Sequence, residues 1–250
     1  MNVDHPAAGQ IPGLRELWKE AFGDSDDFLD GFFATAFDPA RCLCMAEGEH
    51  VLSVAYWLDA AIPEGKCAYI YAVATEKHSR GMGYAHCIME AVRDTLAQRG
   101  YCAAMLVPGD AGLGDFYAAM GYRFFGGVDQ ICALAKSPGV ALQSIDADTY
   151  GRLRGTYLPQ GAVNQTGESL RFLETYAALY AGEDFLLAAF VEDDTVSGLE
   201  LLGNGKKAPY ILQTLGAKQG SFRIPGTKPF AMWLPLRDCQ EPTYFGIAFD

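Results

Sequence analysis

The chain lacks the features that would place it at a membrane. No uninterrupted apolar run approaches the roughly 18 residues that a transmembrane helix requires. Residues 1–6 contain neither a basic region nor an apolar core, so the sequence predicts no secretory signal peptide. We therefore expect a soluble, cytoplasmic protein with no membrane partner.

Basic residues are also scarce. The 250 residues include 19 Lys and Arg against 31 Asp and Glu, for a formal net charge of −12 at pH 7. Binding a nucleic-acid backbone usually requires clustered Lys and Arg, so this balance argues against nucleic acid as the main partner. It is compatible with a cationic or amine-bearing substrate. Hydrophobic residues make up 50% of the chain, which is enough for one large or two small domains.

The seven cysteines include no C-x-x-C pair, and their number is odd. Such a scattered set fits free thiols in a reducing cytoplasm. Cys42 and Cys44 could form a metal or redox pair, but alternation along a strand would point both side chains to one face, and no second pair follows. We therefore interpret them as structural and predict no metal site.

The first half of the chain shows a helical pattern and then a strand pattern. Apolar residues recur at helical spacing before Gly23, and Ser25 stands where it would cap a second, phenylalanine-rich helix. Those phenylalanines must pack in the core or line an apolar cleft. The remaining expected elements are strands at 42–45, 51–58, 67–74 and 102–107, a helix between the last two, a short helix ended by Gly121, and a closing strand pair at 122–125 and 128–135.

Turn residues at 136–139 predict a domain boundary, which divides the chain into residues 1–138 and 139–250. Beyond it, helices are predicted at 150–157 and 169–180, and strands at 185–191, 195–202, 209–215, 229–236 and 243–249. Both halves therefore contain two helices followed by three strands. Segment 47–54 also matches 192–199, and 69–70 matches 210–211. Either a duplicated unit or chance similarity between common hairpins explains these matches.

A glycine-bearing loop follows the strand at 67–74 and opens directly into a helix. A loop in this position presents unpaired backbone N–H groups at the positive end of the helix dipole, where they can bind phosphate. Two common nucleotide patterns do not fit it. No Lys-Ser or Lys-Thr pair follows, as a P-loop requires, and a dinucleotide fingerprint would need glycine where His86 stands.

Two motifs instead resemble the GNAT superfamily of acyl-CoA-dependent N-acyltransferases. Arg80-x-x-Gly83-x-Ala85 resembles the family motif [QR]-x-x-G-x-[GA], and it lies between an apolar strand and a helix, as it does in the family. Phe116-Tyr117, followed three residues later by Gly121-Tyr122, resembles a later family element. One helix and one strand separate the two motifs, which is the family order.

The resemblance implies acetyl-CoA, or another acyl-CoA, as co-substrate. The exposed backbone of the preceding strand would pair with the amide-bearing pantetheine arm. The loop would hold the pyrophosphate through its backbone N–H groups, with glycine allowing close approach and arginine adding positive charge. The cofactor-binding residues so implied are Val73, Ala74, Thr75, Arg80, Gly81, Met82, Gly83, Tyr84 and Ala85. Alternatively, the glycines only make a tight turn.

Tyr117 is the catalytic candidate, because a phenol can protonate the thiolate that leaves when an amine attacks a thioester. The alternative is an amphipathic-helix residue with its hydroxyl at the surface. Asp110 is expected to be the N-cap of that helix. No general base is evident from the sequence. Four carboxylates qualify by proximity in sequence alone, although we interpret them as turn and surface residues: Glu47, Glu49, Asp59 and Glu64.

The resemblance further implies an α/β (α+β) GNAT fold, with a mixed, mostly antiparallel sheet flanked by helices and duplicated along the chain. Residues 1–138 would carry the acyl-CoA site, and residues 139–250 would form a degenerate second half. Residues 216–220 stand where a second cofactor loop is expected, but they lack the motif. In some tandem members the terminal carboxylate enters the active site, which raises the same role for Asp250.

The leading hypothesis is an N-acetyltransferase that transfers an acetyl group directly to a primary amine. A non-catalytic acyl-CoA-binding or regulatory protein is the alternative, and a hydrolase is disfavoured because no G-x-S-x-G motif is present. The amine acceptor could be a small molecule or a peptide. Five aromatic residues would suit an amphipathic cation, namely Trp18, Phe32, Phe33, Trp57 and Tyr69. The sequence does not reveal the oligomeric state.

Overall fold

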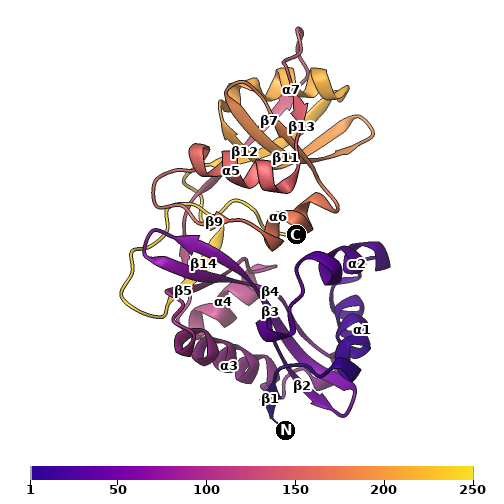
Figure 1. The fold of residues 1–250 in the computed structure, drawn as a ribbon, viewed down its shortest axis with the longest axis vertical. Coiled ribbons are helices and arrows are strands. Elements are labelled where there is room, and N and C mark those ends of the chain that lie inside the picture. Colours follow the sequence, from indigo (N-terminus) through magenta and orange to yellow (C-terminus); the bar gives the residue numbers. More distant parts are fainter. Residues whose placement is uncertain (1, 250) are drawn as a thin grey trace.

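The computed structural model describes residues 2–249, which form two sheets (Figure 1). The first sheet has the order β1-β2-β3-β4-β5-β14-β6, and the short β9 also pairs with β3. Only β4 and β5 pair in parallel within it. Its strands are β1 (Val3–Asp4), β2 (Cys42–Glu47), β3 (His50–Ile62), β4 (Gly65–Thr75), β5 (Ala103–Leu106), β6 (Arg123–Phe125), β9 (Asn164–Gln165) and β14 (Ala231–Pro235).

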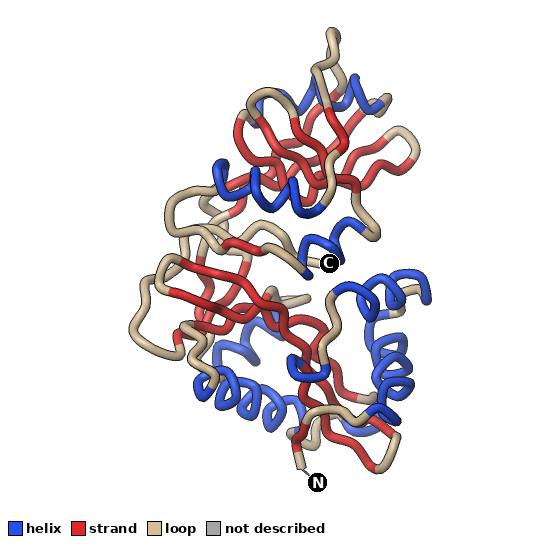
Figure 2. Tube along the Cα trace, in the orientation of Figure 1, coloured by secondary structure: helices blue, strands red, loops and turns tan. Residues whose placement is uncertain are grey.

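Helices cover both faces of this sheet (Figure 2). On β3, Val54 and Tyr56 pack with the helices α1 (Ile11–Phe22) and α2 (Asp26–Thr35), whereas Trp57 packs with α3 (Tyr84–Gln98) and α4 (Ala111–Ala119). This alternation explains why the strand is apolar along most of its length. The cap signals are confirmed, since Gly23 ends α1 at φ 76° and Ser25 Oγ accepts a hydrogen bond from Phe28 N in α2. No helix within residues 2–249 is long and apolar enough to cross a bilayer.

The second sheet has the order β7-β13-β12-β11-β10-β8, with β12 and β13 parallel. One face carries α7, and the other carries α5 and α6 in the same apolar core as α1 and α2. An order of two helices and then three strands recurs in both halves, but in the second half the three strands are β10, β11 and β12, because the predicted strand at 209–215 lies in α7. The elements are β7 (Val128–Leu134), β8 (Gln143–Ser144), α5 (Ala147–Tyr157), α6 (Glu168–Glu174), β10 (Ala178–Ala181), β11 (Phe185–Glu192), β12 (Thr195–Gly203), α7 (Ala208–Leu215) and β13 (Gln219–Pro225).

The two sheets exchange one strand each. β14 lies between β5 and β6, while β7 pairs with β13 of the second sheet (Figure 1). The predicted closing pair at 122–125 and 128–135 is therefore wrong, because each strand pairs with residues at least 85 positions later in the chain. At the crossing, Gly226 N donates to Gly127 O at 2.9 Å, and a Cβ on Gly127 would collide with the Gly226 carbonyl. Glycine permits this close backbone approach.

Three other expectations in the second half are wrong. Residues 209–215 lie in α7, because Ala208, Ile211 and Leu212 pack one helical face onto the sheet, and a short apolar run does not distinguish helix from strand. Residues 243–249 form no strand, although most are buried. Residues 169–180 divide between α6 and β10.

The sequence matches between the halves do not correspond to the repeat in the fold. In each sheet the strand before the crossover helix pairs in parallel with the strand after it, so β12-α7-β13 corresponds to β4-α3-β5. The match of 47–54 with 192–199 therefore aligns the β2–β3 turn with the β11–β12 turn. In the fold, however, the β11–β12 turn corresponds to the β3–β4 turn. The second-half counterpart of the glycine loop before α3 is 203–207, which precedes α7, and not 216–220, which follows it.

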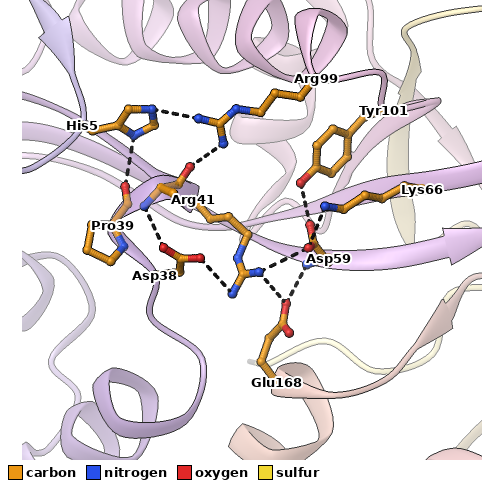
Figure 3. Close-up of polar contacts among 10 residues, drawn as sticks. His5, Asp38, Pro39, Arg41, Asp59, Lys66, Arg99, Tyr101 and Glu168 are labelled. Carbon is orange, nitrogen blue, oxygen red and sulfur yellow. Dashed lines mark hydrogen bonds and ion pairs between the residues drawn. The ribbon is translucent and has the colours of Figure 1, made fainter.

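A polar cluster joins the first sheet to α6 (Figure 3). Arg41 Nη1 lies 3.2 Å from Asp59 Oδ2 and 3.5 Å from Glu168 Oε1. Asp59 also accepts a hydrogen bond from Tyr101 Oη at 2.6 Å and lies 2.8 Å from Lys66 Nζ, while its backbone N–H donates to Glu168. Because a charged network of this kind is satisfied on several sides, it holds α6 against β3.

Cys42 and Cys44 behave as expected of structural residues. All seven cysteines are free, and Cys42 and Cys44 are buried in the same core cluster on one face of β2. Burial raises the pKa of both thiols, to about 11 for Cys44. Neither thiol is therefore a reactive thiolate at neutral pH.

Candidate active site

The site lies where β4 and β5 separate. Their parallel ladder covers Cys67 to Tyr69 on β4, whereas the pairing of β4 with β3 continues to Thr75. The register shifts within that second ladder, and Ala72 adopts a φ of 51°, which is rare for a residue other than glycine. Pro108 follows β5 and cannot donate a ladder hydrogen bond. The ladder between β4 and β5 ends at Tyr69, so Val73, Ala74 and Thr75 lie beyond it.

A cavity of about 540 Å³ opens at this separation. Residues of β4, the end of β5, α4 and the α1–α2 connection line it, together with residues of the second half and of the C-terminal segment. Its lining is mostly aromatic and aliphatic: Trp18, Phe22, Asp24, Phe28, Tyr69, Ile70, Tyr71, Ala72, Val73, Leu106, Val107, Pro108, Gly109, Leu113, Tyr117, Tyr176, Phe190, Ala248 and Phe249. Apolar walls with few polar groups are typical of small-ligand sites.

The glycine loop beyond β4 has the geometry of an anion site. Gly81 and Gly83 adopt φ values of 80° and 79°, and the space where their Cβ atoms would lie is open. Gly83 caps α3 without a side chain, so the N–H groups of the first turn remain available to a ligand. The Arg80 Nε–H donates to the Thr75 carbonyl at 3.0 Å, which folds the guanidinium back toward β4. Met82 is exposed.

Tyr117 is buried in the cavity wall, not at the outer surface of α4. Its ring packs edge-on against Phe116 and Tyr122. Burial raises the pKa of its hydroxyl to about 12, so the phenol keeps its proton at neutral pH and can donate it. Asp110 caps α4 by accepting a hydrogen bond from Leu113 N at 2.8 Å, as expected.

Asp24 is the functional candidate that the sequence analysis missed. Among residues 2–249 it contributes the one carboxylate of the cavity lining, and its Oδ2 accepts a hydrogen bond from Trp18 Nε1 at 2.8 Å. The Gly23-Asp24-Ser25 run was interpreted only as a helix stop and a helix cap. A carboxylate held within an apolar cavity attracts a cation.

The four carboxylates considered as bases lie elsewhere, because Glu47, Glu49, Asp59 and Glu64 are all absent from the cavity lining. Asp59 instead belongs to the polar cluster with Arg41. Of the five aromatic candidates, Trp18 and Tyr69 line the cavity and the other three do not. Within residues 2–249, no group of three or more His, Cys, Asp or Glu side chains is arranged to hold a metal ion.

The C-terminal segment reaches the same cavity. Ala248 and Phe249 line it, and the Phe249 ring lies 5.4 Å from that of Tyr71 and 5.6 Å from that of Tyr69. Figures 1 and 2 show the end of the chain between the two sheets, beside α6 and α2. The role considered for Asp250 lies outside the described residues.

Comparison with protein families finds one match, over residues 2–125, to a family described as an acetyltransferase (GNAT) domain. The matched segment contains both sequence motifs and ends at β6, before the chain enters the second sheet. Comparison with curated proteins finds no match.

Solved structures share the fold over nearly the whole chain. A GCN5-related N-acetyltransferase from Kribbella flavida is 18% identical with a TM-score of 0.69, covering 93% of this chain and 70% of its own. One from Anabaena variabilis is 12% identical with a TM-score of 0.71, covering 94% and 73%. A tandem GNAT protein from the clavulanic acid biosynthesis pathway is 11% identical with a TM-score of 0.57, covering 96% and 100%. The duplicated, mostly antiparallel architecture is therefore shared.

Proposed function

The chain belongs to the acetyltransferase (GNAT) family, and from that premise we propose that it transfers an acetyl group from acetyl-CoA to a primary amine. One observation carries the proposal. A single stretch of chain borders the cavity at Val73 and continues along β4 beyond the end of the β5 ladder. It then presents the open N–H groups of the glycine loop. A long ligand with amide groups at one end and phosphates at the other matches that order.

Acetyl-CoA would bind along this stretch. The pantetheine arm would pair with the backbone of Val73, Ala74 and Thr75 beyond the end of the β5 ladder, as an extended peptide adds to a sheet edge. The N–H groups of Arg80, Gly81, Met82, Gly83, Tyr84 and Ala85 would hold the pyrophosphate. Arg80 would add positive charge, although its Nε–H bond to Thr75 directs it toward the strand. The thioester would then lie in the cavity beside Tyr117.

The chemistry proposed is direct transfer. The free amine attacks the thioester carbonyl, forming a C–N bond while a backbone N–H near Val73 stabilises the oxyanion. The C–S bond breaks, and the departing thiolate takes the proton of the Tyr117 hydroxyl. The amide nitrogen then loses its extra proton, which restores Tyr117 directly or through water.

The two halves would divide the work. Residues 1–138 would supply the cofactor loop and Tyr117. The exchanged strands are the exception to this division, since β7 of this half pairs in the second sheet and β14 of the other half pairs in the first. Residues 139–250 would supply no second cofactor site, because the loop at 203–207 has neither an arginine nor the family spacing. Tyr176, Phe190 and Phe249 would instead shape the acceptor side of the cavity.

The activity is tested with a panel of primary amines and acetyl-CoA, following the release of free CoA thiol. We expect thiol release that depends on the amine, together with acetyl-CoA binding detectable by calorimetry. The second candidate is a non-catalytic acyl-CoA-binding protein; within residues 2–249, Asp24 is the one carboxylate that lines the cavity and could serve as a base. Binding without turnover across the panel would establish that candidate and rule out the enzyme.

We expect Asp24→Asn to raise the KM for the amine about tenfold while leaving acetyl-CoA affinity unchanged, because a hydrogen-bonded ion pair with an ammonium contributes roughly 1.5–3 kcal/mol. The amide oxygen can still accept the Trp18 Nε1–H bond, so the local fold is kept. Steady-state kinetics provide the measurement. Asp27→Asn is the matched control, since it removes the same charge three residues away and outside the cavity lining. Equal KM changes in the two variants would contradict the role of Asp24.

A further inference from the structure

The C-terminal segment, residues 243–249, follows no regular strand but is hydrogen-bonded along its length. Val163 N donates to the Tyr244 carbonyl at 2.8 Å, and Gln165 Nε2 donates to the Ile247 carbonyl at 2.9 Å. Arg223 Nη1 donates to the Gly246 carbonyl at 2.9 Å. These donors come from β9 of the first sheet and its preceding residue, and from β13 of the second. The segment is therefore attached to strands of both sheets before it reaches the cavity.

A fully buried ionic cluster provides its side-chain attachment. Arg154 of α5 donates to both carboxylate oxygens of Glu200 on β12, at 2.7 and 2.9 Å, and both residues have 0% exposure. Two phenols donate further hydrogen bonds to this carboxylate, Tyr150 Oη at 3.1 Å and Tyr244 Oη at 3.0 Å. Of these four residues, Tyr244 alone belongs to the C-terminal segment.

The path of the segment depends on a glycine. A Cβ on Gly246 would collide with the Tyr244 hydroxyl and with Glu200 Oε1, so the Tyr244 ring folds back over residue 246. The attachment also lies where β12 and β13 separate, because their ladder ends at Gly198 and Phe222. Glu200 and Arg223, which stand just beyond that end, contact the segment from the two strands.

We propose that the buried Glu200–Arg154 pair, acting through Tyr244, positions the C-terminal segment so that Phe249 forms a wall of the acceptor side of the cavity. The effect on catalysis rests on the proposed function, whereas the attachment itself does not. Phe245 lies 4.9 Å from Tyr69, and Phe249 lies 5.1 Å from Phe172 of α6, so displacement of the segment would widen the cavity without touching the cofactor loop. Tyr244 and Glu200 are therefore positioning residues for the acceptor.

The chain offers a matched pair of variants to test this. Tyr244→Phe and Tyr150→Phe each remove one hydroxyl from the same carboxylate and leave the ring and the Arg154 pair in place. We expect Tyr244→Phe to speed amide hydrogen exchange at residues 245–249 about tenfold, because it loses a hydrogen bond to a charged group. It should raise the KM for the amine severalfold with kcat and acetyl-CoA affinity nearly unchanged. Tyr150→Phe should leave exchange in residues 245–249 and the amine KM as in the parent protein.

The outcomes separate positioning from general stability. Equal changes in both variants, or no change in exchange at residues 245–249 for Tyr244→Phe, would overturn the proposal, because the hydroxyl would then only stabilise the cluster. Faster exchange in Tyr244→Phe with an unchanged amine KM would overturn the acceptor role. If no amine in the panel is acetylated, the proposed function fails, and the exchange comparison still decides the attachment.

Discussion

Replacing Tyr117 with phenylalanine is expected to lower turnover by at least about 100-fold, which is within the typical range for loss of a general acid. The affinity for acetyl-CoA should remain nearly unchanged. The hydroxyl is the only group removed, and it lies in the cavity wall beside the separation of β4 and β5. Without it, the thiolate must leave unprotonated. Steady-state thiol release and calorimetric acetyl-CoA binding measure the two quantities.

Tyr122→Phe is the matched control for this experiment. Its ring lies 5.9 Å from that of Tyr117, and its buried hydroxyl has no hydrogen-bond partner within residues 2–249, but Tyr122 does not line the cavity. Removing this hydroxyl should leave turnover within about twofold of the parent protein. If Tyr117→Phe leaves turnover unchanged, the proton-donor role is ruled out. Equal losses of turnover in the two variants would rule it out as well.

The pH profile of the parent enzyme provides a related readout. Burial raises the pKa of Tyr117 to about 12, so its proton is present at neutral pH and is lost only as the pH rises through that value. We expect the rate to increase with pH as the acceptor amine deprotonates, with no loss from Tyr117 below about pH 10.

Replacing Arg154 with leucine destabilises the fold by about 3–5 kcal/mol, because it leaves the Glu200 carboxylate buried without its cation. Chemical denaturation followed by tryptophan fluorescence measures the loss, and Arg152→Leu, an exposed position on the same helix, is the control. The double variant Arg154→Leu/Glu200→Leu should recover much of the stability, since it removes both charges. If Arg154→Leu is as stable as Arg152→Leu, the buried pair does not stabilise the fold in this way.

Local chemistry made much of the first half predictable. The stop at Gly23 and the caps at Ser25 and Asp110 depend on residues within three or four positions, so the sequence alone located these helix ends. The glycine loop, which we propose to bind the cofactor, was recognisable for the same reason, because positive φ at Gly81 and Gly83 is a local requirement. Tyr117 was found because its motif follows at a family spacing.

The errors and omissions have a common cause in contacts between distant residues. The apolar run at 209–215 fits helix or strand equally well, and only packing on the second sheet selects the helix. Asp24 has a turn-like sequence context, and its place in the cavity depends on the Trp18 contact and on β4. The position of Phe249 depends on the hydrogen bonds of Tyr244 to Glu200 and of Gln165 to Ile247, which attach the segment to strands of both sheets.

The sequence by itself determined the repeated order of elements, the glycine loop and Tyr117, because caps, turns and motifs are set by neighbouring residues. Only the tertiary structure decided which strands were exchanged, where the cavity opened, and that Asp24 and Phe249 entered it. These features minimise exposed apolar area and unpaired polar groups across the whole chain, and many combinations of distant segments can satisfy the same local patterns. The β4–β5 separation depends on both, since the strand and loop that border the cavity are recognisable from the sequence, whereas the second half completes the cavity only in the tertiary structure.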